Sequence, residues 1–148
     1  MRNFYRDVFS ISEHRLLVIT GHLYLDYILE KMLEKANLEL SEKQKQSFHI
    51  KVDKLNKSNM FDSETLISLI EINRLRNLLA HNIFYEISDW DPNRLPYAAK
   101  FNIKIPKRKY LLKAFNITYL RVSFFALIVV LSNQHKWLYL EDNPRRLR

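Results

Sequence analysis

The sequence predicts an all-α protein: a bundle of four to five helices that forms one domain over residues 1–148. The chain has 148 residues, of which 47% are hydrophobic, enough to build one core. It contains one glycine, Gly21, and no proline before Pro92. This scarcity of turn-forming residues favours long helices joined by short connections.

The first helix is expected to run from about Glu13 to Ala36, with Ser12 as its N-cap. Its apolar residues recur mostly at helical spacing, and they are Leu16, Leu17, Ile19, Leu23, Tyr24, Tyr27, Ile28 and Leu33. Gly21 in the middle costs up to about 1 kcal/mol relative to alanine. We therefore predict that another helix crosses close to Gly21.

Two further helices follow. Residues 41–44 read Ser-Glu-Lys-Gln, a capping box that predicts a second helix running to about Lys57. Its narrow apolar stripe consists of Phe48, Val52 and Leu55. A third helix, capped by Asp62 or Ser63, is apolar over most of its circumference, which predicts a central position.

Residues 82–110 differ from the rest because they hold three of the four prolines. We expect an irregular proline-containing arm here, with a short two-stranded element formed by residues 83–87 and 100–104. Aromatic residues of the arm could stack on bases or anchor the arm to its own domain, and these are Trp90, Tyr97 and Phe101.

A last helix is expected from about Asn116 or Thr118 to Trp137. Residues 122–131 are uncharged, but ten apolar residues are too few to cross a bilayer, which takes about 20. We therefore predict a helix that is buried in the core or at a subunit interface, and no membrane partner. The absence of cysteine excludes disulfides and thiolate catalysis and suits a reducing cytoplasm, so we expect a cytoplasmic protein.

The charge is strongly positive, +8 with a pI near 9.7, which indicates an acidic partner. Between residues 100 and 140 there are eight Lys or Arg and no Asp or Glu, and the tail at 140–148 is also basic. One interpretation is a solvated basic surface. The other is an RNA-binding patch made of Lys100, Lys104, Lys107, Arg108 and Lys109.

The third helix ends with Arg-Asn-Leu-Leu-Ala-His at residues 76–81. Asn77 and His81 are four residues apart and lie on one face of a helix. Arg76 is about 140° from His81 on an ideal helix, so its long side chain must reach across or the last turn must be distorted. Arg74, two residues before Arg76, could support the site.

A polar stripe on the first helix contains His22, Asp26 and Glu30. The pair His22–Asp26 could bind a metal, but two or three ligands on one helix are few, and we predict no metal. We expect instead that the stripe faces the third helix, with Asp26 or Glu30 orienting His81 or Arg76.

The Arg-Asn-x3-His pattern resembles the Arg-x4–6-His signature of HEPN domains, small helical proteins many of which are metal-independent ribonucleases. The order of helices is similar to the branch that includes the mannitol operon repressor family. The resemblance covers about residues 12–82 and fades in the arm. It implies an antiparallel helical bundle.

The resemblance implies RNA cleavage in which the ribose 2′-oxygen attacks its neighbouring phosphate, in a toxin–antitoxin or phage-defence setting. A histidine can serve as base or acid, and an arginine can bind two phosphate oxygens. His81 and Arg76 would take these roles, with Asn77 orienting the phosphate or the imidazole. No metal or other cofactor is implied.

One histidine cannot readily act as both base and acid, so the resemblance also implies a homodimer with two facing motif helices. RNA and a cognate antitoxin protein are the other implied partners. The alternative is a non-catalytic regulatory or binding module of the mannitol operon repressor type. In that case Arg76 would cap helix carbonyls and His81 would interact with the helix dipole.

Overall fold

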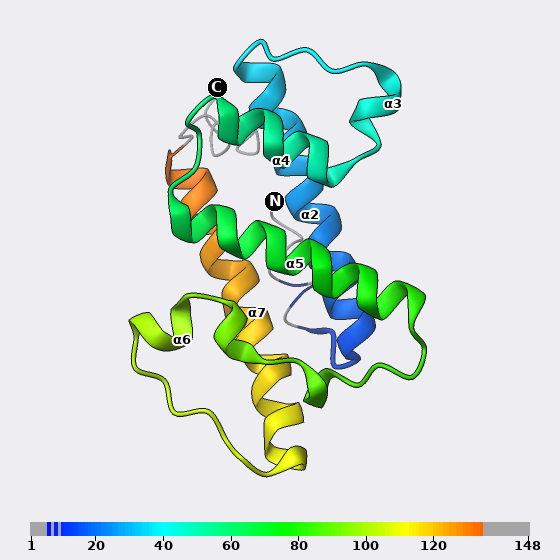
Figure 1. Cartoon of the computed structure of the whole chain (residues 1–148), viewed down its shortest axis with the longest axis vertical. Helices are drawn as coiled ribbons and strands as arrows, with labels where there is room; N and C mark the ends of the chain where they lie inside the picture. Colours follow the sequence, from blue (N-terminus) through cyan, green and yellow to red (C-terminus); the bar gives the residue numbers. More distant parts are fainter. Residues whose placement is uncertain (1–5, 7, 9, 135–148) are drawn as a thin grey trace, which may run out of the picture.

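The computed structural model describes Arg6, Val8 and residues 10–134. Over this part of the chain the structure is helical and contains no β-strand, which confirms the all-α prediction (Figure 1). The longer elements are α2 (His14–Lys35), α4 (Phe48–Lys57), α5 (Ser63–His81) and α7 (Lys109–Gln134). The shorter ones are α3 (Glu42–Lys45), α6 (Tyr97–Lys100) and the 3₁₀ turns η1 (Ile87–Asp89) and η2 (Pro92–Arg94).

The N-cap of α2 is Glu13 and not Ser12. Both carboxylate oxygens of Glu13 accept backbone N–H groups, from Arg15 at 2.9 Å and from Leu16 at 2.7 Å. This longer side chain satisfies two of the free N–H groups that every helix start leaves. The helix ends at Lys35, with Ala36 as its C-cap.

The capping box at residues 41–44 forms as predicted, but the helix that it opens is short. The amide of Gln44 donates to Ser41 Oγ, and Gln44 Oε1 accepts from the Ser41 amide. α3 is only one turn long, and none of its residues is buried. A new helix, α4, then begins with Ser47 as its N-cap and turns its apolar stripe into the core, namely Phe48, Val52 and Leu55.

α5 is capped by Asp62, whose carboxylate accepts the N–H of Thr65 at 2.7 Å. It lies across the middle of the molecule between α2 and the arm, as its apolar sequence predicts (Figure 1). Contacts between Arg15 and Leu79 and between His22 and Asn73 show that α2 and α5 run antiparallel.

The arm forms no strand in the described part of the chain, so the expected pairing of residues 83–87 with 100–104 is wrong. Ile87 instead begins η1, and both Ile87 and Trp90 are buried in the core. Pro92 and Pro96 favour the short helical turns η2 and α6, because proline cannot donate to a β-ladder. Asn102, with φ of 51°, reverses the chain after α6.

α7 begins at Lys109, seven residues before Asn116, and Trp137 lies outside the described residues. Asn116 is buried within the helix, where its side-chain N–H donates to the carbonyls of Ile87 and Trp90 at 2.8 and 3.0 Å. The arm is thereby held against α7.

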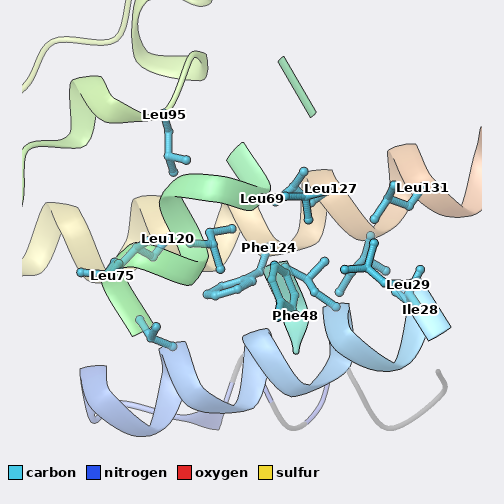
Figure 2. Packing of buried hydrophobic residues seen from close by; sticks show 14 of the residues in the cluster. Ile28, Leu29, Phe48, Leu69, Leu75, Leu95, Leu120, Phe124, Leu127 and Leu131 are labelled. Carbon is cyan, nitrogen blue, oxygen red and sulfur yellow. The ribbon is translucent and has the colours of Figure 1, made fainter. Parts of the chain in front are cut away.

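α7 is 26 residues long, so the ten uncharged residues 122–131 are only part of a longer apolar helix. Residues Lys109–Ser132 are long and apolar enough to span a bilayer, and they contain an 18-residue window with a mean hydropathy of 1.9. In this fold 44% of that window is buried inside the protein. Leu120, Phe124 and Leu127 contribute to the core (Figure 2). Val122 and Phe125 are 53% and 39% exposed, so only one face of the helix is buried within this chain.

The predicted close approach at Gly21 is confirmed. A Cβ placed on Gly21 would lie 2.5 Å from Cε1 of Phe124 in α7. Glycine is therefore required at this position to let α7 cross α2, and Phe124 lies in the centre of the packed cluster (Figure 2).

Candidate functional site

The motif residues lie on the solvent-facing side of the C-terminal half of α5. Arg76 is half-buried, whereas Asn77 and His81 are exposed. Arg76 Nη1 donates to Asn77 Oδ1 at 3.0 Å. The guanidinium therefore reaches the strip of helix that carries Asn77, as the sequence predicts.

Next to Arg76 is a cleft of about 400 Å³ between α2, α5 and the turn that joins α3 to α4. Its lining is mostly polar and includes His22, Asp26, Gln46, Asn73, Arg76 and Asn77. His81 does not belong to this lining. We call this feature the polar cleft.

His22 lies buried at the polar cleft. Its Nε2 is 3.0 Å from Asn73 Oδ1, and its ring packs on Phe48 with centroids 4.2 Å apart. Burial lowers the pKa of His22 from its ordinary value of 6.5, and the opposing effect of the Asn73 hydrogen bond is smaller. His22 is therefore neutral at pH 7 and donates its Nε2–H to the Asn73 carbonyl oxygen.

Asp26 and Glu30 do not orient Arg76 or His81, so that prediction is wrong. Lys51 Nζ lies 2.9 Å from both carboxylate oxygens of Asp26 and 3.9 Å from Glu30 Oε1. The Lys51 side chain is only 2% exposed, and a buried ammonium needs such a partner.

The stripe of His22, Asp26 and Glu30 is thus committed to contacts within the protein. Across the described residues, no group of three or more His, Cys, Asp or Glu side chains is arranged to hold a metal ion.

Arg74 faces the arm rather than the polar cleft. It forms a two-point ion pair with Glu71, with Nε–Oε2 and Nη2–Oε1 distances of 2.9 and 2.7 Å. The buried Glu71 carboxylate also accepts the indole N–H of Trp90 at 2.8 Å. Arg74 therefore stabilises the arm and has no contact with Arg76, which lies on the other side of α5.

The C-terminal end of α5 is held by Arg15, a residue that the sequence analysis did not single out. Its guanidinium donates to the carbonyl of Leu79 and to those of Ile83 and Tyr85, at 2.8 and 3.0 Å for the last two. Arg15 thus takes the carbonyl-capping role that the alternative interpretation gave to Arg76. No local pattern distinguishes Arg15 from other basic residues, because its partners are more than 60 positions away.

His81 is the last residue of α5, and the final turn is regular, with the Asn82 N–H bonded to the Leu78 carbonyl at 2.9 Å. Its ring makes no hydrogen bond or ion pair with the residues that the structure describes. His81 shares a face with Asn77 but is not brought into contact with Arg76.

The predicted RNA-binding residues divide into two groups. Lys100 is paired with Glu64 at 2.7 Å, and Lys109 lies 3.5 Å from Asp89. The others are exposed and have no carboxylate partner in the described part of the chain, namely Lys104, Lys107 and Arg108.

The aromatic residues of the arm divide in the same way. Trp90 is buried, and Tyr97 lies half-buried with its hydroxyl 3.5 Å from Ser68 Oγ. Phe101 is 65% exposed, and the Lys100 ammonium lies 5.9 Å from the centre of its ring.

The chain matches no protein-family model, and comparison with curated proteins and with solved structures gives no significant similarity. The link to HEPN domains therefore rests on the motif residues and the order of the helices.

Proposed function

We propose that this protein is a metal-independent endoribonuclease of HEPN type that acts as a homodimer. The observation that carries the proposal is the hydrogen-bonded pair of Arg76 and Asn77 on the rim of the polar cleft, with His81 exposed one turn further along the same face. These residues supply a fixed cation, an amide and an imidazole at one solvent-facing end of a helix.

In this mechanism Arg76 binds the non-bridging oxygens of a phosphodiester and stabilises the charge that grows on them. His81 of one protomer removes the proton from the ribose 2′-hydroxyl as the 2′-oxygen forms a bond to phosphorus. The bond to the 5′-oxygen breaks, and the second His81 of the dimer protonates this leaving oxygen. The products are a 2′,3′-cyclic phosphate and a free 5′-hydroxyl.

The dimer is supported by exposed apolar side chains on α2 at helical spacing, namely Leu16, Ile19 and Tyr27. The antiparallel pairing of Arg15 with Leu79 and His22 with Asn73 places this stripe beside the motif segment of α5. An apolar stripe of this kind is a typical protein-binding surface. A two-fold partner bound there would bring the second motif helix close to the first.

The test is RNA cleavage in the presence of EDTA by the wild type, Arg76→Ala and His81→Ala. Arg94→Ala, which removes an exposed arginine of η2, serves as the control. We expect cleavage by the wild type and the control and a loss of at least about 100-fold in the two motif variants. Intact RNA with the wild type, or equal cleavage by all four proteins, would refute the nuclease.

In a toxin or phage-defence setting, expression of the wild type alone should also arrest growth, and a cognate antitoxin protein should relieve the arrest. His81→Ala should be tolerated without the antitoxin.

One observation favours the non-catalytic alternative of the mannitol operon repressor type. The His81 ring has no hydrogen-bond partner among the described residues, so nothing within one chain orients it for proton transfer. A binding module would need only the exposed basic residues that have no carboxylate partner in the described part of the chain, Lys104, Lys107 and Arg108. It would bind RNA in the same assay and leave it uncut.

A further inference from the structure

The polar cleft is lined by three residues of α5 that retain N–H donors with no partner among the described residues; in the Arg76 guanidinium only Nη1 is paired, with Asn77. Asn73, Arg76 and Asn77 stand at i, i+3 and i+4, and so lie on one face of the helix. The carbonyl oxygens of both amides are occupied, that of Asn73 by His22 and that of Asn77 by Arg76. Their NH₂ groups have no partner among the described residues and remain as donors.

The charge of the polar cleft favours an anion. Lys51 neutralises Asp26, the one carboxylate in the lining, from beneath. No carboxylate of the described chain pairs with Arg76, and the neighbouring His22 is neutral at pH 7. One uncompensated guanidinium with two amide donors matches the oxygen atoms of a phosphate.

The dimensions of the polar cleft favour more than a bare phosphate. A volume of about 400 Å³ falls in the range of pockets that hold small organic ligands. Besides the polar residues, the lining contains Leu23, which is 62% exposed, and the exposed ring of His49. An apolar side chain and an aromatic ring offer flat contacts for a sugar and a base.

We propose that the polar cleft binds one nucleotide of single-stranded RNA, with its phosphate on Asn73, Arg76 and Asn77 and its base against Leu23 and His49. This inference rests on the proposed nuclease function and deepens it, because it makes Asn73 a substrate-binding residue. It also gives His22 a role: its hydrogen bond holds the Asn73 amide with the NH₂ group free for the ligand.

The test is a titration of the full-length His81→Ala protein with uridine and adenosine monophosphates and with inorganic phosphate. The readout is the side-chain NH₂ resonances of Asn73 and Asn77 in ¹H–¹⁵N spectra. Because a mononucleotide has no internucleotide phosphodiester to cleave, the shifts report binding alone. We expect both amides to shift with the nucleotides and to shift only at much higher concentrations of inorganic phosphate.

The decisive variant is Asn73→Asp. It retains an oxygen to accept the His22 N–H but replaces the NH₂ donor with a negative charge. Asn56→Asp, on α4 outside the lining, introduces the same charge as a matched control. The dissociation constant for a nucleotide should rise at least about tenfold in Asn73→Asp and stay unchanged in Asn56→Asp.

Two results would overturn the inference: nucleotides that leave both amides unshifted, or inorganic phosphate that binds as tightly as the nucleotides. The nuclease proposal can fail separately. Nucleotide binding that depends on Asn73, together with intact RNA in the cleavage assay, would support the polar cleft and refute the nuclease. Equal RNA cleavage by wild type and Asn73→Asp, with unshifted amides, would support the nuclease and refute nucleotide binding in the polar cleft.

Discussion

The indole N–H of Trp90 donates to Glu71 Oε1 at 2.8 Å, and this contact joins the arm to the central helix. Glu71 is buried and also binds Arg74, so one carboxylate serves two donors from different parts of the chain. Asn116 completes the attachment by donating to the carbonyls of Ile87 and Trp90. The arm is therefore an integral part of the fold, although its sequence lacks helical periodicity.

Removal of this shared acceptor should destabilise the protein. Glu71→Ala leaves the buried Trp90 N–H without a partner and Arg74 without its carboxylate, which should lower the free energy of unfolding by about 2–4 kcal/mol. Urea denaturation measures the loss, and trypsin should cut faster after Lys104 and Lys107 in the arm. Glu86→Ala, at an exposed position nearby, is the control. Equal stability of the two variants would contradict the structural role of Glu71.

Gly21 should tolerate no side chain. In an ordinary helix Gly→Ala is stabilising by up to about 1 kcal/mol, but here the added Cβ would lie 2.5 Å from Phe124. We expect Gly21→Ala to lower the free energy of unfolding by about 1–3 kcal/mol. Combination with Phe124→Leu should recover part of the loss, so the two substitutions should be non-additive. A stabilised Gly21→Ala protein would show that the helices do not cross this closely.

The pair of Lys51 and Asp26 should respond unequally to loss of either partner. Asp26→Ala leaves a buried ammonium with only Glu30 at 3.9 Å, and should cost about 3–5 kcal/mol of stability. Lys51→Met removes the buried charge and leaves Asp26, whose side chain is 30% exposed, to be hydrated. It should cost under about 2 kcal/mol. Thermal or urea unfolding of both variants checks the order, and the reverse order would contradict the burial of Lys51.

His22 should make stability depend on pH. Burial holds its pKa in the folded protein below the ordinary value of 6.5, despite the opposing effects of Asn73 and Asp26. The unfolded chain then binds more protons than the folded one at pH values just below 6.5. The contribution of His22 to stability is therefore fully present above pH 6.5, the pKa in the unfolded chain. It is lost as the pH falls through the lower pKa of His22 in the folded protein.

The variant His22→Gln can still donate to Asn73 and does not titrate. Its unfolding free energy should fall less than that of the wild type between about pH 7.5 and about pH 5. Some slope will persist, because burial also lowers the pKa of His14. Identical slopes in urea denaturation for variant and wild type would contradict the burial of His22.

Much of the fold could be predicted because local patterns determine it. The capping box at Ser41, the Asp62 cap and the apolar circumference of α5 each specify a helix start or position without reference to the rest of the chain. The role of Gly21 was predictable for the same reason: an unfavourable residue in a long helix requires a compensating contact.

The errors arose where distant contacts determine the structure. The capping-box helix stops after Lys45, and none of its residues is buried. α7 begins seven residues before Asn116, whose side chain contacts the distant arm. In the site, the pairing of Arg76 with Asn77 follows from adjacency. The contacts of Lys51 with Asp26 and of His22 with Asn73 join residues 25 and 51 positions apart, which no local pattern predicts.

The most direct test of the central claim is the chemistry of the ends that wild-type protein leaves on a defined single-stranded RNA in EDTA. Attack by the 2′-oxygen, with Arg76 and His81 in the roles proposed, predicts a 2′,3′-cyclic phosphate and a 5′-hydroxyl. A 2′-deoxy substitution at the cut position should then abolish cleavage there. RNA that stays intact, fragments with 5′-phosphate ends, or cleavage that continues at the 2′-deoxy position would contradict the account.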